Sequence, residues 1–418
     1  MLRGIQIRLY PNEEQARYAR RLLGDCRFIY NKLTAFVRDA DKGKTPSAKD
    51  RYAYYMSLQK DFPFLTETHS KVRAQSRVDF DAALQNHFTR HIGLPKFKKK
   101  DRGDSCRFPV DAIMGVHGNR IDLVKAFRDI HFKCSKRDMR FLNRNREAVR
   151  SATLRLAPSG KFMMSVLVED GHDYTLPKQN NPKYAGVDLG LKDFCVIADG
   201  ETIRRVENPK IGRKAQERIA RLQRALARKQ KLGENRRKAK ARLARAFEKT
   251  KDFRTEFLHR ESTRLVTENQ GIAVETLNVR GMMKNHKLAR SVCDASWSRF
   301  VQMLEYKCRK FGREFRKADR WFASSQTCHV CGKASSVTKD LSVRDWVCPH
   351  CGAVLDRDGN AALNLRRECF SLELGLGSPE ETSVETEALA HGAAYAAPCV
   401  KLPSVKQETK TGLFAVSC

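Results

Sequence analysis

Two pairs of closely spaced cysteines limit the possible folds of this chain more than any other feature. Cys328 and Cys331 form one CxxC pair, and Cys348 and Cys351 form a second after sixteen intervening residues. Four thiolates at this spacing typically hold Zn²⁺ in a tetrahedral site, and a glycine follows each pair to let the chain turn. Because protein ligands fill all four positions, the predicted zinc ion is structural. The alternative is four unrelated or redox cysteines.

The remaining cysteines do not extend this pattern. The sequence has thirteen cysteines, an odd number, and the other nine are scattered without regular spacing. This distribution differs from a secreted disulfide framework and favours a reducing compartment with one metal site. His329 and His350 lie inside the CxxC pairs, where either could replace a cysteine ligand, lie at the surface or contact a phosphate.

The charge balance indicates a polyanionic partner. The 418 residues, enough for two or three domains, include 81 Lys and Arg against 48 Asp and Glu, a formal net charge of +33. We see no run of ~20 apolar residues for a membrane span, and the charged start MLRGIQIRLYPNEEQ does not resemble a signal peptide. We therefore expect a nucleic-acid-binding protein of the prokaryotic cytosol, associated with the nucleoid, with no membrane partner and no indication of oligomerisation.

The first half of the sequence combines strand-like and helix-like patterns. Residues 3–10 alternate apolar and polar side chains, as in a half-buried strand, and residues 105–180 are strand-like, with two strands around a Pro-Ser-Gly turn. Between them, residues 13–38 and about 68–92 have the periodicity of amphipathic helices, joined by the polar stretch DKGKTPSAKD. The pattern predicts a helical segment inserted into a β-rich domain.

The second half indicates an α/β domain. AGVDLGLKDFCVIADG predicts a strand, a glycine turn and a strand, and IAVETL predicts another short strand. Residues 210–251 form a helical run that Gly233 is expected to break. A further helix is expected at about 253–268, and another begins at Asp294-Ala-Ser-Trp297. Beyond about residue 372, small and polar residues predict disorder.

Three acidic residues have surroundings that favour metal chemistry. Asp188 lies inside the apolar strand GVDLG, Glu275 ends IAVE, and Asp358 precedes a helix in DRDGNAA. An acid in an apolar strand is costly unless something compensates it. Three acids meeting in one place would repel each other and need cations. Two Mg²⁺ or Mn²⁺ ions ~4 Å apart would neutralise them, activate a water and stabilise the leaving oxygen of a phosphodiester.

Each acid taken alone has another explanation. Gly-x-Asp-x-Gly also marks tight turns, and a glutamate at the end of a strand indicates little by itself. The segment around Asp358 is more specific, and it lies seven residues beyond Cys351. At a helix start, Asp358 gains from the positive end of the helix dipole. Ala361 and Ala362 would let that helix pack closely against the sheet.

Two basic segments predict phosphate contacts. Residues 210–251 carry 17 Lys and Arg against 3 Glu, which is too unequal for alternating ion pairs and favours phosphate binding over a solvated face. The loop GLPKFKKK could stack a base on its phenylalanine and hold phosphates, or it could be a basic surface loop with one anchoring aromatic. The candidate contacts are Lys96, Lys98, Lys99, Lys100, Arg221, Arg224, Arg228, Arg236 and Arg237.

Eight motifs follow one another along residues 1–372, namely RLYPNEEQ, RFIYN, GLPKFKKK, GVDLGLKDF, IAVETL, DASWSRF, SSQTCHVCG and CPHCGAVLDRDGNAALNL. Together they resemble the TnpB family, RNA-guided endonucleases that bacterial insertion sequences carry and that are related to type V CRISPR effectors. The resemblance implies a multidomain fold of α+β and α/β type. Its implied parts are a wedge-like β-barrel (1–10 and 101–180), an inserted helical recognition domain (11–100), a RuvC-like nuclease domain of ribonuclease H fold (183–372), a zinc ribbon inserted in it (324–355) and a disordered tail (373–418).

The resemblance also implies an activity. Members of the family bind a noncoding guide RNA from their own element, recognise a short motif beside the target, open the DNA duplex and cut both strands at one RuvC site. The motifs place the catalytic, Mg²⁺-binding acids at Asp188, Glu275 and Asp358, with Asp356 supporting the metal site or the turn. Residues 64–80, where contacts to the flanking motif would lie, match only loosely, so we assign none there.

Three other functions fit the same residues. An RNA-guided DNA-binding regulator would not cleave, although all three acids are present here. A zinc-ribbon nucleic-acid binder would use the acids only for structure. A RuvC-type resolvase or transposase would recognise DNA without a guide RNA.

Overall fold

The structure is a computed structural model, and it describes residues 2–40, 44–100, 104–200, 202–340 and 342–375. Most of the segment predicted to be a disordered tail lies outside these residues. Within the described chain, no helix is both long enough and apolar enough to cross a membrane.

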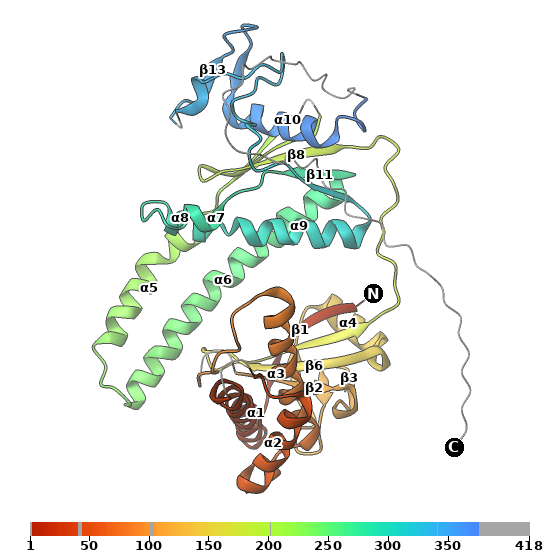
Figure 1. Cartoon of the computed structure of the whole chain (residues 1–418), viewed down its shortest axis with the longest axis vertical. Helices are drawn as coiled ribbons and strands as arrows, with labels where there is room; N and C mark the ends of the chain where they lie inside the picture. Colours follow the sequence, from red (N-terminus) through yellow and green to blue (C-terminus); the bar gives the residue numbers. More distant parts are fainter. Residues whose placement is uncertain (1, 41–43, 101–103, 201, 341, 376–418) are drawn as a thin grey trace, which may run out of the picture. The chain divides into compact units, whose positions relative to one another are not determined.

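The chain forms two compact units, which we describe separately (Figure 1). The first unit comprises Met1–Asp173 and Ala215–Lys251, and the second comprises Tyr174–Lys214 and Asp252–Cys418. The basic segment predicted at 210–251 therefore belongs mostly to the first unit.

A seven-stranded antiparallel sheet forms the core of the first unit. Its strands are β1 (Leu2–Tyr10), β2 (Ser105–Pro109), β3 (Gly115–His117), β4 (Arg120–Asp122), β5 (Ile130–Lys133), β6 (Val149–Leu156) and β7 (Phe162–Glu169). Their order is β2-β6-β7-β1-β5-β4-β3, and β6 and β7 form the predicted hairpin. Among these strands the two edges, β2 and β3, do not pair. The sheet is therefore curled and open. It is not the closed β-barrel that the resemblance implied.

Three helices are inserted between β1 and β2, two of them at the predicted positions, and a fourth precedes β6. Helix α1 begins with a capping box in which the Asn12 side chain accepts the Gln15 backbone N–H at 2.8 Å,. Helix α2 was not predicted, because it buries only Tyr55 and Leu58 and has little amphipathic pattern,. The helices are α1 (Glu13–Asp39), α2 (Ala48–Asp61), α3 (Ser70–Arg90) and α4 (Lys136–Arg144), with 3₁₀ turns η1 (Pro63–Glu67), η2 (Val110–Ala112) and η3 (Arg146–Ala148).

A five-stranded mixed sheet forms the core of the second unit. Its strands are β8 (Tyr184–Leu189), β9 (Asp193–Ala198), β10 (Ile203–Glu207), β11 (Gly271–Val274) and β12 (Glu314–Lys317). The order is β10-β9-β8-β11-β12, with antiparallel pairing from β10 to β8 and parallel pairing from β8 to β12. Consequently the carboxyl ends of β8, β11 and β12 meet at one edge of the sheet.

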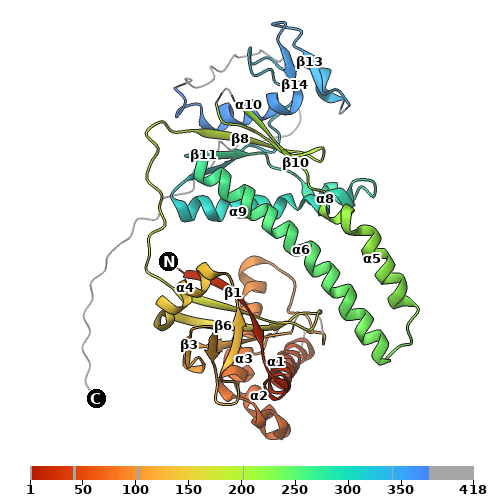
Figure 2. The ribbon, with the colours of Figure 1, turned by 180° about the vertical axis from the view of Figure 1, so that it is seen from behind.

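Helices cover both faces of this sheet (Figures 1 and 2). Helix α10 (Arg357–Phe370) lies on one face, where Leu365 and Phe370 pack against Tyr184 and Ala273. Helix α9 (Trp297–Phe311) and the end of α6 (Glu234–Glu268) lie on the other face, on the side of Val187. The mixed α/β domain predicted from the alternating patterns is confirmed.

The helical run after β10 differs from its prediction in one respect. Helix α5 (Ile211–Ala227) and α6 are separated around Gly233, as predicted. The separate helix expected at 253–268 is wrong, because α6 continues through this region and no glycine or proline interrupts it,. The helices α7 (Val279–Met282) and α8 (Ala289–Ala295) precede α9, and Asp294 of α8 accepts the backbone N–H of Gly212 at the start of α5.

Candidate functional site

Asp188 lies near the carboxyl end of the central strand β8, between β9 and β11. Side chains alternate along a strand, so Asp188 shares a face with Gly186, and Val187 points to the opposite core. In the antiparallel register Asp188 pairs with Val196 of β9. Burial in this apolar sheet means that its carboxylate needs a compensating charge.

Glu275 follows β11 directly and becomes the neighbour of Asp188. In the parallel register Val274 pairs with Val187, so the next residues of the two strands are Glu275 and Asp188. The backbone N–H of Leu189 donates a hydrogen bond to Glu275 Oε1 at 2.9 Å. The register of two parallel strands therefore brings together acids that lie far apart in the sequence.

A close approach of helix α10 brings the third acid to this edge. A Cβ on Gly186 would lie only 1.9 Å from the carbonyl oxygen of Ala362 and 2.6 Å from the nitrogen of Arg366. Ala361 and Ala362 are buried, as the predicted close packing requires. Asp358 occupies the first turn of α10, and its charge acts on both Asp188 and Glu275.

Two of the three acids, Asp188 and Glu275, have raised pKa values. Burial raises the pKa of Asp188 well above its ordinary value, and the charges of Glu275 and Asp358 raise it further. Burial also raises the pKa of Glu275 to about 7, against the opposing effect of the Leu189 hydrogen bond. A site that protonates so readily would be stabilised in its ionised form by a bound cation.

The two acids of the DRD segment, Asp356 and Asp358, each contact an arginine but have different roles. Arg344 Nη1 contacts both carboxyl oxygens of Asp358 at 3.1 Å. Asp356 instead caps α10, where its Oδ2 accepts the Gly359 N–H at 2.7 Å, and it also pairs with Arg205 at 2.5 Å. Of the two roles considered for Asp356, the structure shows the support of the turn.

The four predicted zinc ligands come together in the insertion between β12 and α10. Among the described residues only Cys328, Cys331, Cys348 and Cys351 bring three or more His, Cys, Asp or Glu ligand atoms within 4.8 Å of one another. The three acids do not form a second such group among the described residues, and Arg344 pairs with Asp358.

The two CxxC turns have the geometry that a tetrahedral thiolate site needs. Gly332 and Gly352 follow the pairs with φ values of +74° and +72°, a backbone region that favours glycine,. Their N–H groups donate to the carbonyls of Cys328 and Cys348 at 2.8 and 2.9 Å. The insertion also contains the hairpin of β13 (Asp345–Val347) and β14 (Val354–Asp356) and the turn η4 (Val337–Lys339).

Both histidines within these turns lie outside the thiol cluster. The His329 ring lies with Nδ1 3.1 Å from Asn360 Oδ1, and the His329 backbone N–H donates to the same oxygen at 2.9 Å. The His350 ring lies with Nε2 3.3 Å from the carbonyl oxygen of Ala334. Asn360, which is 2% exposed, also donates to the carbonyl of Thr327 at 2.7 Å. This amide therefore joins helix α10 to the first CxxC turn.

Comparisons with known proteins agree with this geometry. Residues 164–286 match the family OrfB_IS605, described as "Probable transposase", and residues 297–365 match the TNB domain of Cas12f1-like proteins. A protein of Streptomyces pristinaespiralis named as an RNA-guided DNA endonuclease is 33% identical over 371 residues, which cover 87% of this chain and 88% of that protein. The chain belongs to the TnpB family.

A second curated protein and a solved structure also match over most of the chain. InsQ of Escherichia coli (strain K12), also named as an RNA-guided DNA endonuclease, is 26% identical over 387 residues, covering 87% of this TnpB-family chain and 91% of InsQ. Among solved structures, a Cas12f1–sgRNA–target DNA complex matches with a TM-score of 0.34 and 16% identity, over 88% of this chain and 99% of that chain.

Residues 1–40 match a family described as a helix-turn-helix domain. In this TnpB-family chain the segment is strand β1 followed by the single continuous helix α1. A strand and one helix do not make the two-helix unit that such a domain uses to read DNA. The family description therefore does not describe the local structure here.

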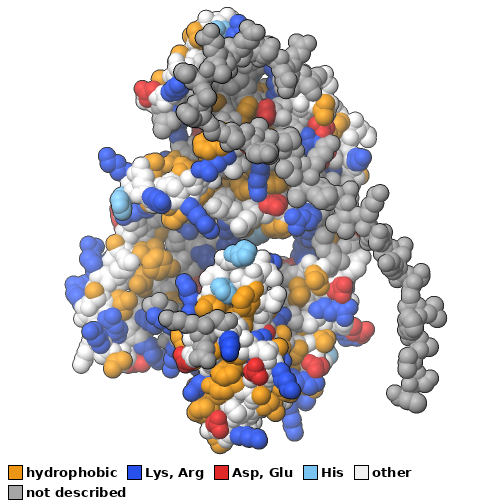
Figure 3. Space-filling view, viewed as in Figure 1, with side chains coloured by type: hydrophobic (Ala, Val, Ile, Leu, Met, Phe, Trp, Pro, Cys, Tyr) orange, Lys and Arg blue, Asp and Glu red, His pale blue; other side chains and the backbone are white. Residues whose placement is uncertain are grey.

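The structure places the predicted basic contacts in different environments. Arg221 and Arg224 are exposed on α5 and Arg228 is exposed directly after it, in a region where Figure 3 shows many Lys and Arg side chains at the surface. Arg236 instead donates to the carbonyls of Leu226 and Lys229 at 2.9 Å and secures the end of α5. Arg237 is exposed and pairs with Glu234.

The basic loop before β2 is similarly divided. Lys96, Lys99 and Lys100 are exposed. Lys98 is half-buried, with its ammonium 3.9 Å from the centre of the Tyr30 ring, and burial lowers its pKa. Three features of this TnpB-family chain were not anticipated from sequence: Arg344 at Asp358, the Asn360 junction, and a pocket on α1. All three depend on contacts between distant segments, which no local pattern reveals.

Proposed function

We propose that this chain is an RNA-guided DNA endonuclease of an insertion sequence. The convergence of Asp188, Glu275 and Asp358 at one edge of the mixed sheet is the observation that carries this proposal. Family membership supports it, because relatives covering most of the chain are named RNA-guided DNA endonucleases. We propose that it acts in the prokaryotic cytosol, where genomic DNA is accessible.

The donor set suits Mg²⁺ or Mn²⁺. Hard divalent cations prefer carboxylate oxygens, and the raised pKa values of Asp188 and Glu275 are the signature of anions that lack a counter-charge. When bound, two such ions supply an activated water and stabilise the leaving oxygen of a phosphodiester. We propose all three acids as the ligands and the RuvC-like catalytic set.

Neighbouring residues position the three acids through hydrogen bonds and ion pairs. The Leu189 N–H fixes one oxygen of Glu275 and favours its ionised form,. Arg344 keeps Asp358 paired, so binding of cations requires this arginine to exchange partners or to remain beside the site. Asp356 holds the first turn of α10 in place through its cap.

The four cysteines fit one structural Zn²⁺. Soft thiolates in a closed group of four leave no position for water or substrate, unlike the carboxylate site. We propose that residues 324–355 form a zinc ribbon within a ribonuclease H-like domain at 183–372. The curled sheet of residues 1–10 and 101–180, with the helices of 11–100, would form the wedge and recognition regions.

The partners would be a noncoding guide RNA and double-stranded target DNA. The net charge of +33 and the exposed arginines of α5 support contacts with phosphates,. These contacts hold nucleic acid without reading its sequence, so guide pairing would supply the specificity.

Cleavage by a purified ribonucleoprotein tests the proposal. The protein is expressed with its native flanking DNA, the bound RNA is sequenced, and a matched duplex carrying a library of flanking sequences is incubated with Mg²⁺. We expect cutting that EDTA stops and that Asp358→Asn abolishes. Asp356→Asn is the matched control: it loses the same charge but keeps a capping side chain, and it should retain most activity.

The other outcomes identify the alternatives. Guide-dependent binding without cutting, unchanged by Asp188→Ala, would indicate an RNA-guided regulator. The family description as a transposase makes guide-independent action the second candidate. Cutting that survives RNase treatment of the purified protein, with no specific RNA bound, would favour that candidate and remove the proposed function.

A further inference from the structure

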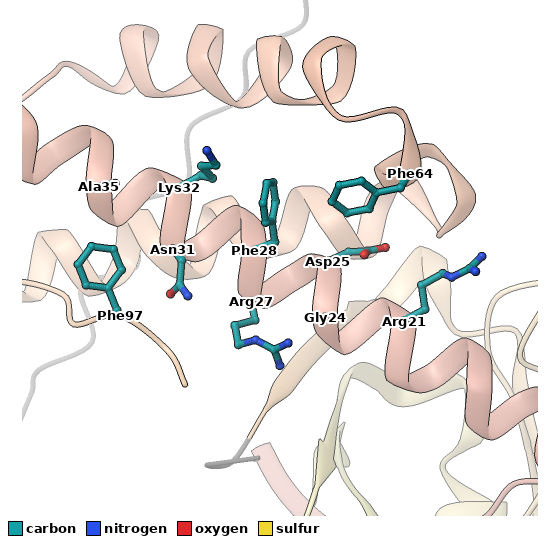
Figure 4. Close-up of a pocket in the computed structure, with 10 residues that line it drawn as sticks. All are labelled: Arg21, Gly24, Asp25, Arg27, Phe28, Asn31, Lys32, Ala35, Phe64 and Phe97. Atoms are coloured by element: carbon teal, nitrogen blue, oxygen red, sulfur yellow. The ribbon is translucent and has the colours of Figure 1, made fainter. Parts of the chain in front are cut away.

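Helix α1 lines a pocket of about 600 Å³ in the first unit, outside the candidate nuclease site. Figure 4 shows Phe28 next to Phe64 of η1 and, farther along the helix, Phe97 of the basic loop. Pockets of this size accommodate small organic ligands. None of the proposed catalytic or zinc-binding residues contributes to it.

The floor of the pocket is a stripe of small residues on α1. Gly24, Asn31 and Ala35 lie on the same face as Phe28, since their spacing of three and four residues matches the helical repeat,. Asn31 is fixed by hydrogen bonds with the backbone of Lys98 at 2.7 and 2.9 Å. The floor is therefore a defined surface and not a loose one.

Packing inside the protein does not require a glycine at position 24. A glycine inside a helix costs roughly 0.5–1 kcal/mol relative to alanine. A Cβ at Gly24 would meet only the Arg27 guanidinium, at 4.0 Å, so no neighbouring atom forbids a side chain there. The missing side chain instead keeps the pocket along this face of α1 open, as a ligand-binding surface would require.

The walls are aromatic and partly exposed. The Phe64 and Phe97 side chains are 43% and 48% exposed and thus offer ring surface to a ligand. The Phe28 and Phe64 rings meet edge to face with centroids 5.4 Å apart. Rings arranged in this manner provide faces and edges on which a nucleobase can stack.

The charge around the pocket is positive. Arg21, Arg27 and Lys32 line it, and the Lys32 ammonium lies 5.5 Å from the Phe28 ring centre. The acid of the lining, Asp25, is buried, and Thr68 donates to its carboxylate at 2.6 Å. Arg27 pairs with Asp104 at 2.5 Å and Arg21 pairs with Glu67, so Lys32 is the better-placed phosphate contact.

We propose that this pocket binds a single unstacked nucleotide of the bound nucleic acid, with its base against Phe28, Phe64 and Phe97 and its phosphate at Lys32. The inference rests on the proposed function, since it needs a nucleic-acid partner. The combination of aromatic walls, small floor and cationic rim matches a nucleotide, which has one flat apolar part and one anionic part.

Photocrosslinking in the assembled complex tests the proposal and identifies the source of the nucleotide. One arm uses guide RNA containing 4-thiouridine, and the other uses target DNA containing 4-thiothymidine. Peptides that carry Phe28, Phe64 or Phe97 should crosslink in one arm, which assigns the nucleotide to RNA or to DNA. Absence of these crosslinks in both arms would overturn the proposal.

Filling the pocket provides the second readout. Gly24→Leu, which also favours the helix, should weaken binding of the crosslinked strand about 5- to 100-fold, and Gly24→Ala less so, in order of side-chain volume. Glu14→Leu, on an exposed turn of α1 away from the pocket, should bind like wild type. Equal binding by Gly24→Leu and wild type would contradict the proposal.

Two safeguards keep the result interpretable. If Gly24→Leu melts early, the double variant Phe64→Ala/Phe97→Ala, which changes only partly exposed side chains, decides the matter in the same assays. Wild-type cleavage is measured separately. Failure to cut with intact crosslinks removes the proposed nuclease function alone, whereas normal cutting and normal binding by Gly24→Leu remove the pocket proposal alone.

Discussion

At Gly186 the absence of a side chain sets the distance between strand β8 and helix α10. A Cβ there would overlap the backbone of α10, and the approach brings Asp358 into the electrostatic environment of Asp188. From sequence, the glycines of GVDLG could equally mark a tight turn. The structure gives Gly186 a packing role that directly positions the third acid.

Gly186→Ala should therefore separate α10 from the sheet. We expect a loss of roughly 1–3 kcal/mol or more in the free energy of unfolding and at least a tenfold loss of cleavage. Urea denaturation and cleavage assays measure the two effects. Gly93→Ala is the control, because a Cβ there meets no atom within 4 Å. Wild-type stability and activity in Gly186→Ala would contradict the packing argument.

The raised pKa of Glu275 predicts a pH dependence of stability. Burial raises this pKa to about 7 from an ordinary 4.5, so the folded state binds more protons than the unfolded state between these values,. The metal-free protein should lose roughly 1–3 kcal/mol of stability as pH rises from 4.5 to 7. Thermal melting in EDTA measures this.

Two comparisons separate this effect from other titrating groups. Glu275→Gln should flatten the slope between pH 4.5 and 7, and saturating Mg²⁺ should restore stability at pH 7 in wild type only. A slope unchanged by Glu275→Gln would show that the loss arises elsewhere.

At the scale of elements, sequence periodicity predicted those with one buried face. Helix α1, the β6–β7 hairpin and strands β8, β9 and β11 lie where their patterns indicated. Periodicity missed α2 and β10, which bury few side chains. It placed a boundary inside α6, where the chain has none. The order of the acids was readable, but their proximity required the register of two parallel strands.

At the scale of elements, the Asn360 side chain links α10 to the first CxxC turn by hydrogen bonds. Asn360→Leu should leave the His329 N–H without its partner, costing roughly 1–3 kcal/mol for the unsatisfied group,. The Thr327 carbonyl keeps the Asn364 amide as a donor at 2.5 Å. We expect faster zinc release to a chromogenic chelator and a lower melting temperature. His350→Ala, which loses one long contact at the surface, should release zinc like wild type. Equal zinc release rates for both variants would contradict the proposed role of Asn360.

At the scale of the whole molecule, charge dominates the interaction with nucleic acid. A net charge of +33 was evident from composition, but which arginines are available was not. The exposed Arg221, Arg224 and Arg228 differ from Arg236, whose guanidinium is used by the carbonyls at the end of α5. Local sequence cannot distinguish these roles, because they depend on how α6 returns beside α5.

Salt dependence should reveal this difference. The logarithm of the association constant for nucleic acid should fall linearly with the logarithm of salt concentration. Replacing Arg221, Arg224 and Arg228 with Gln should reduce the slope by about one per lost phosphate contact. Arg236→Gln should lower the melting temperature with little change in slope. The reverse pattern would contradict the assigned roles.

The position of the thiol cluster between β12 and α10 has a consequence for the life of the element that encodes this protein. Asp358 follows Cys351 by seven residues. If the four cysteines bind the proposed zinc ion, the last acid reaches the sheet through a segment whose folding depends on that ion,. On the proposed function, the protein would need Zn²⁺ to fold this segment and Mg²⁺ or Mn²⁺ to cleave DNA. In a zinc-starved host, newly made chains would accumulate without a complete catalytic site. The frequency of DNA cleavage by the element would then depend on the zinc supply of the host cell.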